Sequence, residues 1–131
     1  MSKLFNEAPP SQLVEECAAD LARQLGGSSD QTKTQLRRFY QEYVGLRERI
    51  TDDETYKRYE PKVKMMLSKA AYARRGGRGD SKIPEEFYKW FVGNIKQIKS
   101  HQDVALFGQY FEAVVGYYYN YANEVRAGGR R

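Results

Sequence analysis

Apolar and aromatic residues recur every three or four positions along this chain of 131 residues, and no stretch shows the strict alternation that is typical of strands. The spacing is clearest near the C-terminus, where Phe107, Phe111, Val114 and Tyr118 fall on one side of a helix. A period close to 3.6 residues is typical of helices that bury one face. The sequence therefore predicts an all-α protein.

Proline, glycine and acidic residues divide this pattern into about five helices. The helices are expected over residues 11–25, 34–50, about 60–73, 84–98 and 101–125. Pro61 is placed in the first turn of the third helix, where the missing N–H of proline does no harm. Asp52 and Asp53 lie before this helix and are expected to break the chain or to cap a helix.

The length of the chain suits one domain, which we expect to be a single-domain helical bundle over residues 11–126. Residues 1–10 end in a double proline and are expected to form a flexible N-terminal segment, and residues 127–131 a flexible tail. The predicted core residues are Leu13, Val14, Cys17, Ala18, Leu21, Leu25, Leu36, Phe39, Tyr40, Tyr43, Ile50, Val63, Met66, Leu67, Ala70, Ala71, Phe87, Trp90, Phe91, Ile95, Ile98, Val104, Phe107, Phe111, Val114, Val115 and Tyr118.

Positive charge is concentrated in the middle of the chain. Between Lys33 and Lys82 there are 14 Lys and Arg residues against 7 Asp and Glu residues, whereas the rest of the chain holds 8 against 10. A local positive field attracts the phosphates of nucleic acids, an anionic membrane or an acidic protein. A membrane is the weakest of these three hypotheses, because the core needs the apolar faces of the helices.

The basic residues of this region include a set on one side of a predicted helix. Arg38, Glu42, Gly45 and Arg49 share a helical stripe opposite much of the apolar face. Arginine grips a phosphate with two hydrogen bonds at once, although each single cation also fits an ordinary solvated surface. The basic set consists of Arg37, Arg38, Arg47, Arg49, Lys62, Lys64, Lys69, Arg74, Arg75, Arg78 and Lys82.

The sequence is poorly supplied for catalysis. His101 is the only histidine and Cys17 the only cysteine, so one Cys–His pair is the nucleophilic arrangement that the chain offers. Cys17 fits an apolar helical stripe and His101 begins a helix, which favours structural roles. Residues 52–54 (DDE) suit a cation site or a helix cap, and the cap is the expectation. We expect no enzymatic activity, no metal and no cofactor.

Two observations bear on the compartment. A single cysteine cannot form an intrachain disulfide, which fits a reducing environment. No apolar run approaches the roughly 20 residues of a membrane span, and the first residues do not resemble a secretion signal. The chain is therefore expected to be soluble and cytoplasmic.

Tyrosines cluster near the C-terminus. Tyr117, Tyr118, Tyr119 and Tyr121 wrap most of a helical turn, so at least two must face away from the core of this chain. They suit contact with a neighbouring protein or stacking on nucleic-acid bases. The low positive charge around them favours protein contact.

Four blocks of the sequence follow one another in a characteristic order. The blocks are TQLRRFY at 34–40, KVKMMLSKAAYARR at 62–75, residues 85–98, and FGQYFEAVVGYYY at 107–119. Each block alone is an ordinary amphipathic helix, but four in the right order are fairly specific. Together, over about residues 32–121, they resemble the small helical subunit of type III-A CRISPR effector complexes, the Csm complexes.

The resemblance implies a non-catalytic subunit that stacks in several copies along an RNA-guided complex. Its implied partners are the guide–target RNA duplex, the other subunits and copies of itself. Contact is expected mainly with the backbone of the single-stranded target RNA, because base pairing reads the sequence. The RNA-binding candidates are Arg37, Arg38, Arg74 and Arg75 from the matching blocks, and Arg47, Arg49, Lys69 and Arg78 from charge alone.

Other hypotheses stay open at this point. The chain also suits a helical protein–protein scaffold whose positive charge serves an acidic partner, or a sequence-nonspecific nucleic-acid-binding protein. A DNA-binding regulator would need a short recognition helix after a tight turn, and the helices here look too long. Long helices joined by a glycine-rich loop also allow two copies to exchange elements in a dimer.

Overall fold

The computed structural model describes residues 2–26, 30–75 and 83–129, and for residues 30, 31 and 122–129 it describes the backbone alone. The described elements are α1 (Pro10–Gln12), η1 (Leu13–Cys17), α2 (Ala18–Leu25), α3 (Asp30–Arg49), α4 (Asp53–Arg74), α5 (Glu85–Gln97) and α6 (His101–Gly129). Because α1, η1 and α2 follow one another without a break, the described ranges form five helices, and they contain no strand. The prediction of an all-α, single-domain bundle is confirmed.

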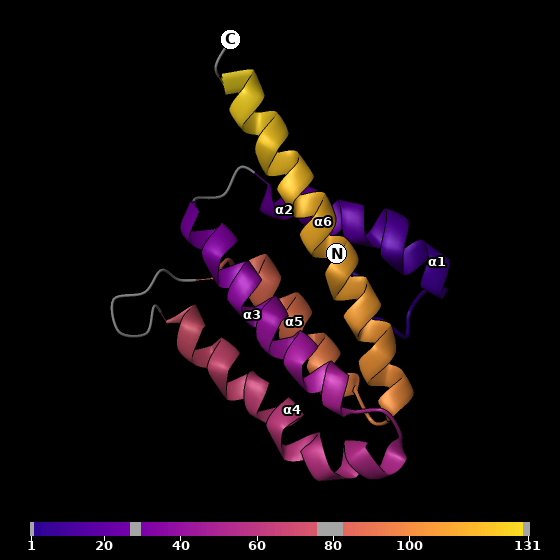
Figure 1. Cartoon of the computed structure of the whole chain (residues 1–131). Coiled ribbons are helices and arrows are strands. Elements are labelled where there is room, and N and C mark those ends of the chain that lie inside the picture. Colours follow the sequence, from indigo (N-terminus) through magenta and orange to yellow (C-terminus); the bar gives the residue numbers. More distant parts are fainter. Residues whose placement is uncertain (1, 27–29, 76–82, 130–131) are drawn as a thin grey trace.

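The helices after the first run back and forth through the bundle. α3 and α5 run in one direction, and α4 and α6 run in the other (Figure 1). α6 packs against α2 and α3, while α4 packs against α5 and, less extensively, against α3. α4 is therefore an outer helix, with one side open next to α3.

The first helix contains one wider turn. Pro9 caps it and Pro10 occupies its first turn, where a helix does not need the N–H that proline lacks. The π-helical turn η1 allows Leu13 and Ala18, five residues apart, both to be fully buried. The predicted core residues of this helix are buried, apart from Val14, which is half-buried.

The N-terminal segment makes contacts that the sequence did not predict. Phe5 is buried, and its backbone N–H donates to Oδ1 of Asn94 at 2.7 Å. The carbonyl oxygen of Lys3 accepts from the hydroxyl of Tyr110 at 2.9 Å. In the segment that was expected to be flexible, Phe5 therefore covers part of the core, because its apolar side chain lies beside Phe107 of α6 while its backbone is held by Asn94 of α5.

α3 and α4 both begin earlier than predicted, α3 at Asp30 and α4 at Asp53. The carboxylate of Asp52 accepts from the Thr55 N–H at 2.8 Å, and Oγ1 of Thr55 accepts from the Asp52 N–H at 3.0 Å. This capping box confirms the predicted cap and begins α4 before Pro61. Pro61 lies inside α4, so the prediction of a first-turn proline is wrong. Its exposed position lets water solvate the carbonyl that it leaves without an N–H partner.

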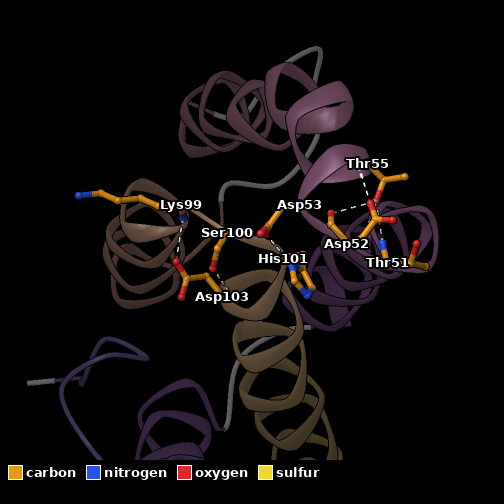
Figure 2. A network of polar contacts seen from close by, with 8 residues as sticks. All are labelled: Thr51, Asp52, Asp53, Thr55, Lys99, Ser100, His101 and Asp103. Carbon is orange, nitrogen blue, oxygen red and sulfur yellow. Dashed lines mark hydrogen bonds and ion pairs between the residues drawn. The ribbon is translucent and has the colours of Figure 1, made fainter.

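The starts of α4 and α6 lie side by side and are joined by polar contacts (Figure 2). Nδ1 of His101, the first residue of α6, lies 2.7 Å from Oδ1 of Asp53. The N–H of Lys99 donates to the Asp103 carboxylate at 2.9 Å, and the N–H of Asp103 donates to the Ser100 hydroxyl at 3.2 Å. These bonds satisfy backbone groups that a helix start leaves unpaired.

Aromatic rings from three helices fill the centre of the bundle. The ring of Phe111 lies 5.4 Å from the ring of Trp90 and 5.8 Å from that of Phe91, both edge to face. Such pairs add to the free energy gained from burial alone. The buried rings are Phe39 and Tyr43 on α3, Phe87, Trp90 and Phe91 on α5, and Phe107, Tyr110 and Phe111 on α6.

The predicted core is confirmed at most positions. Ala71 is exposed, and Val14, Tyr40, Leu67 and Val115 are half-buried, while the other predicted core residues are buried. Ala71 is exposed because α4 is an outer helix that packs mainly against α5 and less against α3 and α6. It buries a narrow stripe, so a residue at the edge of its apolar face stays in water.

Two buried tyrosines make the fold sensitive to alkaline solution. Tyr43 donates its hydroxyl to the carbonyl oxygen of Val104 at 2.7 Å, and Tyr110 donates to that of Lys3. Burial raises the pKa of Tyr43 above its usual value of 10.0 and raises the pKa of Tyr110 to about 12. Each phenol therefore has a higher pKa in the folded state than in the unfolded chain. Between these two values the folded state binds more protons than the unfolded chain, so the free energy of unfolding falls as the pH rises above 10.

We expect the free energy of unfolding to fall above about pH 10 by about 1.4 kcal/mol per pH unit for each of these two phenols. Denaturant unfolding followed by circular dichroism over about pH 8 to 11 measures this slope. The Tyr43→Phe variant has no phenol at this position to ionise. Its free energy of unfolding should therefore fall with pH by about 1.4 kcal/mol less per pH unit, whatever the substitution does to stability at neutral pH. A free energy of unfolding that stays constant up to about pH 11 would contradict the prediction.

The last helix is longer than predicted. α6 continues to Gly129, past its expected end near Val125, and its C-terminal part extends beyond the other helices (Figure 1). Of the expected tail, residues 127–129 are therefore helical in backbone, and residues 130–131 lie outside the described residues. Among the helices that the structure describes, none combines the length and apolar character needed to cross a membrane.

Candidate nucleic-acid interface

A groove runs along the surface between α3 and α4, which lie side by side (Figure 1). It has two halves that share Glu42 and Lys69. The first half, of about 340 Å³, is lined by Leu46, Tyr59, Met65 and Met66, with Arg49 and Lys62 beside them. The second half, of about 830 Å³, is lined mainly by polar side chains, together with Phe39, Tyr72 and Ala73. We call the whole the α3–α4 groove, and its two parts the apolar half and the polar half.

The predicted stripe on α3 faces this groove. Arg38 lines the polar half, Gly45 and Arg49 line the apolar half, and Glu42 lies where the halves meet. A side chain at Gly45 would meet nothing within 4 Å, which shows how open this part of the groove is. The helical period placed these residues together correctly.

The cations of the groove differ in what they contact. Lys69 forms an ion pair with Glu42 across the groove, in the middle of its length. The side chains of Arg49 and Lys62 form no hydrogen bond or ion pair with any described residue. Arg75, exposed at the C-terminal end of α4, is likewise unpaired within the described ranges. These three positive charges are therefore available to an external anion.

Two other candidates on α3 face α6 instead. Nε of Arg37 donates to the hydroxyl of Tyr119 at 2.9 Å, and its guanidinium lies over the same ring at 5.6 Å. The half-buried side chain of Arg47 crosses over Gly108 of α6, and its Nη2 lies 3.9 Å from Oε1 of Glu112. A side chain at Gly108 would clash with Arg47, so this glycine lets the arginine cross the helix.

At the C-terminal end of α4, the candidate Arg74 is paired, in contrast to its neighbour Arg75. Arg74 makes two hydrogen bonds to the carboxylate of Glu85, at 3.0 and 2.7 Å, and lies 4.4 Å above the ring of Tyr88. These contacts fasten α4 to the start of α5. Arg78 and Lys82 lie outside the described residues.

Lys64 belongs to the fold although it was counted with the basic surface. Its ammonium group donates to the carbonyl oxygens of Ile95 and Ile98, both at 3.0 Å, at the end of α5. The Ile95 carbonyl also accepts from the Ile98 N–H at 3.2 Å, and the Ile98 carbonyl, just past the helix, also accepts from the Tyr56 hydroxyl at 3.1 Å. The lysine therefore adds a charged donor to the cap of α5. Desolvation by burial lowers the pKa of Lys64 below its usual value of 10.5.

The tyrosines near the C-terminus contact other helices of the same chain. Tyr118 is buried, whereas Tyr117, Tyr119 and Tyr121 are half-buried. The Tyr121 hydroxyl accepts from Nη2 of Arg23 on α2 at 3.2 Å. Tyr117 and Tyr121 pack against the edge of the core, which the expectation that at least two of the four face away from it did not foresee. Arginine side chains from α2 and α3 lie over the rings of Tyr121 and Tyr119.

Two exposed apolar side chains in the groove were not predicted as functional. Met65 is 56% exposed and Tyr72 is 57% exposed, in contrast to the buried aromatic cluster. The Tyr72 side chain makes no hydrogen bond, ion pair or ring contact with the rest of the described chain. The sequence hints weakly that Met65 and Tyr72 are exposed, because helical spacing places both outside the buried stripe formed by Val63, Met66 and Ala70.

The arrangement offers little to catalysis. Cys17 is buried, and burial is the main reason why its pKa is raised. Its thiol makes no contact with His101, which pairs with Asp53 instead. Within the described ranges, no three His, Cys, Asp or Glu side chains are grouped to hold a metal ion. Asp52 and Asp53 both act at the start of α4, as the cap hypothesis requires.

Comparison with known proteins identifies a family. Residues 8–124 match the family model described as Csm2 Type III-A, a span that covers every helix that lines or supports the groove. Neither the curated proteins nor the solved structures include a match to this chain. The matched span is most of the chain and agrees with the resemblance drawn from the four sequence blocks. The chain therefore belongs to the Csm2 family and is a structural subunit of a type III-A CRISPR complex, in association with other Csm subunits.

Proposed function

We propose that this chain is a non-catalytic, RNA-binding subunit that stacks in several copies along the guide–target RNA duplex and contacts the backbone of the target strand. The α3–α4 groove carries this proposal. Arg49 and Lys62 project from its two walls without a partner in the described chain, Arg38 lines the same groove, and Arg75 stands at one end of α4. Positive charge on neighbouring helices gives a surface that follows a phosphate backbone.

The contacts of the seven candidates within the described residues suggest a division of roles, and Arg78 lies outside them. Arg38 and Arg49 line the groove, Arg75 follows at the end of α4, and these three are the proposed RNA contacts. Lys69 also lines the groove but would have to leave Glu42 to reach a phosphate. The candidates Arg37, Arg47 and Arg74 would have to leave Tyr119, Glu112 and Glu85, respectively, to reach a phosphate. We therefore assign those three mainly to the fold, and Lys62 joins the RNA-binding set.

Backbone contact suits a subunit of an RNA-guided complex, because base pairing between guide and target reads the sequence. The proposed role needs no cofactor and no active site, and it places the chain in the cytoplasm with the RNA and with copies of itself. Specific recognition would require side chains that read base edges in a fixed order. Cations spread along a groove bind any sequence.

The first test is the salt dependence of RNA binding. We expect the purified chain to bind single-stranded RNA weakly and without sequence preference. Its affinity should fall with salt at a log–log slope of about −0.7 for each phosphate contacted. Fluorescence anisotropy with labelled oligonucleotides of several sequences, at several salt concentrations, measures both properties. Binding that is insensitive to salt, or strongly dependent on sequence, would count against the proposal.

A protein–protein scaffold is the second candidate function, and the exposed Met65 in the apolar half of the groove favours it. Methionine and tyrosine are enriched at protein interfaces. Reconstituting the complex with substitutions at the groove residues distinguishes the two functions. Loss of RNA contact with assembly intact supports RNA binding, whereas loss of assembly with RNA contact intact supports the scaffold.

A further inference from the structure

We propose that the polar half of the α3–α4 groove binds an unpaired nucleobase, with the ring of Tyr72 as the stacking surface. This inference rests on the proposed RNA-binding function and deepens it, because it adds a base contact to the backbone contacts. The position of Tyr72 in the groove carries it.

Tyr72 is unusual among the aromatic residues of the described chain. The rings at the centre of the bundle are buried, and Tyr88 and Tyr119 are covered by Arg74 and Arg37. Tyr72 is 57% exposed and its hydroxyl and ring are unpaired within the described ranges. Its face is therefore open to a flat ligand, and every base has a face that stacks on an aromatic ring.

The walls around Tyr72 suit a base better than an apolar peptide. Arg38 and Gln41 bring a guanidinium and an amide to the same half of the groove. The hydroxyl of Ser68 donates to the Met65 carbonyl at 2.8 Å and can still accept a hydrogen bond there. Amide and hydroxyl groups both donate and accept hydrogen bonds, as the edges of bases do. An apolar side chain would remove water from these groups without replacing its hydrogen bonds, which costs free energy.

Charge favours RNA over a protein at this place. Arg38 lines the same half of the groove as Tyr72, and Arg75 follows Tyr72 at the end of α4, where it has no partner in the described chain. Lys69 lies about one helical turn before Tyr72 and neutralises Glu42, the acidic residue of this half. A base on Tyr72 would place its own phosphates within reach of these cations. The occupant is therefore an anionic chain with flat, hydrogen-bonding groups, which describes single-stranded RNA.

Stacking on Tyr72 requires a base that is not already enclosed in a duplex. The site should therefore prefer single-stranded RNA, or an unpaired nucleotide within a duplex, over a continuous duplex. A backbone contact alone carries no such preference. The comparison between the two RNA forms thus tests the base contact separately from the phosphate contacts.

The experiment compares Tyr72→Ala with Tyr72→Phe and with Gln109→Ala as a control, because Gln109 is an exposed, uncharged residue on α6 that does not line the groove. We expect Tyr72→Ala to weaken single-stranded RNA binding by about 5- to 150-fold with an unchanged salt slope. Tyr72→Phe keeps the ring and should bind nearly as well as the original chain. An oligonucleotide containing 2-aminopurine should lose fluorescence on binding the original chain, and less on binding Tyr72→Ala.

Each result decides a different point. If the original chain does not bind RNA in a salt-dependent way, the proposed function fails and this inference fails with it. If it binds RNA but Tyr72→Ala binds equally well, the stacking site is wrong and the function stands. If Tyr72→Ala leaves RNA binding unchanged yet fails to join the other subunits, the groove is a protein interface and the inference is overturned. Thermal unfolding of each variant checks that it is folded.

Discussion

Reversing three charges of the groove together, as Arg38→Glu, Arg49→Glu and Lys62→Glu, should weaken binding of single-stranded RNA by a factor on the order of 100 to 1,000. Arg49 and Lys62 both line the apolar half of the groove and have no partner in the described chain, and Arg38 adds a positive charge in the polar half. The log–log salt slope should become shallower by about 2, because three phosphate contacts are lost.

A matched control separates the groove from overall charge. Lys89, Lys96 and Lys99 are exposed on or just after α5 and do not line the groove. Changing these three lysines to glutamate alters the net charge by the same amount as the groove variant. We expect the control to lose no more than a small part of the affinity. Equal losses for the two triple variants would mean that RNA responds to net charge and that the groove is no binding surface.

The second large effect concerns the aromatic core. Phe111→Ala should lower the free energy of unfolding by about 3–5 kcal/mol, because the ring is fully buried among Trp90, Phe91 and other rings of three helices. That loss is a large share of the roughly 5–15 kcal/mol that stabilises a typical domain. Chemical denaturation followed by circular dichroism measures it. Phe111→Leu fills more of the cavity and should lose clearly less.

The control for this variant lies on the surface. Met65→Ala removes an apolar side chain that is 56% exposed, so the free energy of unfolding should change by no more than about 0.5 kcal/mol. If Phe111→Ala proves no more destabilising than Met65→Ala, the aromatic cluster is not the centre of the fold. The same measurement gives the stability reference needed for the groove variants.

The groove shows why charge alone predicted the interface only in part. The stripe of Arg38, Glu42, Gly45 and Arg49 was predictable because helical period alone decides which residues share a face. That Arg74 would be occupied by Glu85 was not predictable, because the two residues lie on different helices and the helical period does not reveal how two helices pack. The misplacement of Pro61 had a local cause, since the capping box at Asp52 starts the helix earlier than proline does.

The N-terminal segment gives a second example. Phe5 and its neighbour Leu4 lie in a short segment that ends in Pro9 and Pro10, so no periodic pattern marks Phe5 as a core residue. Its burial depends on space between α5 and α6 and on the side chain of Asn94, which accepts from its backbone N–H. These contacts join residues that are far apart along the chain. A pattern read within a window of one helix does not contain them.

The sequence by itself determined the helical class, most of the buried faces and the family, because these depend on periods and motifs within single segments. The tertiary structure alone decided which cations are available, through pairs such as Arg37 with Tyr119, Lys69 with Glu42 and Lys64 with the end of α5. It also placed Tyr72 in a groove between two helices. The physical reason is that the charge and exposure of a side chain depend on the neighbours that folding brings to it, and those neighbours come from other parts of the chain.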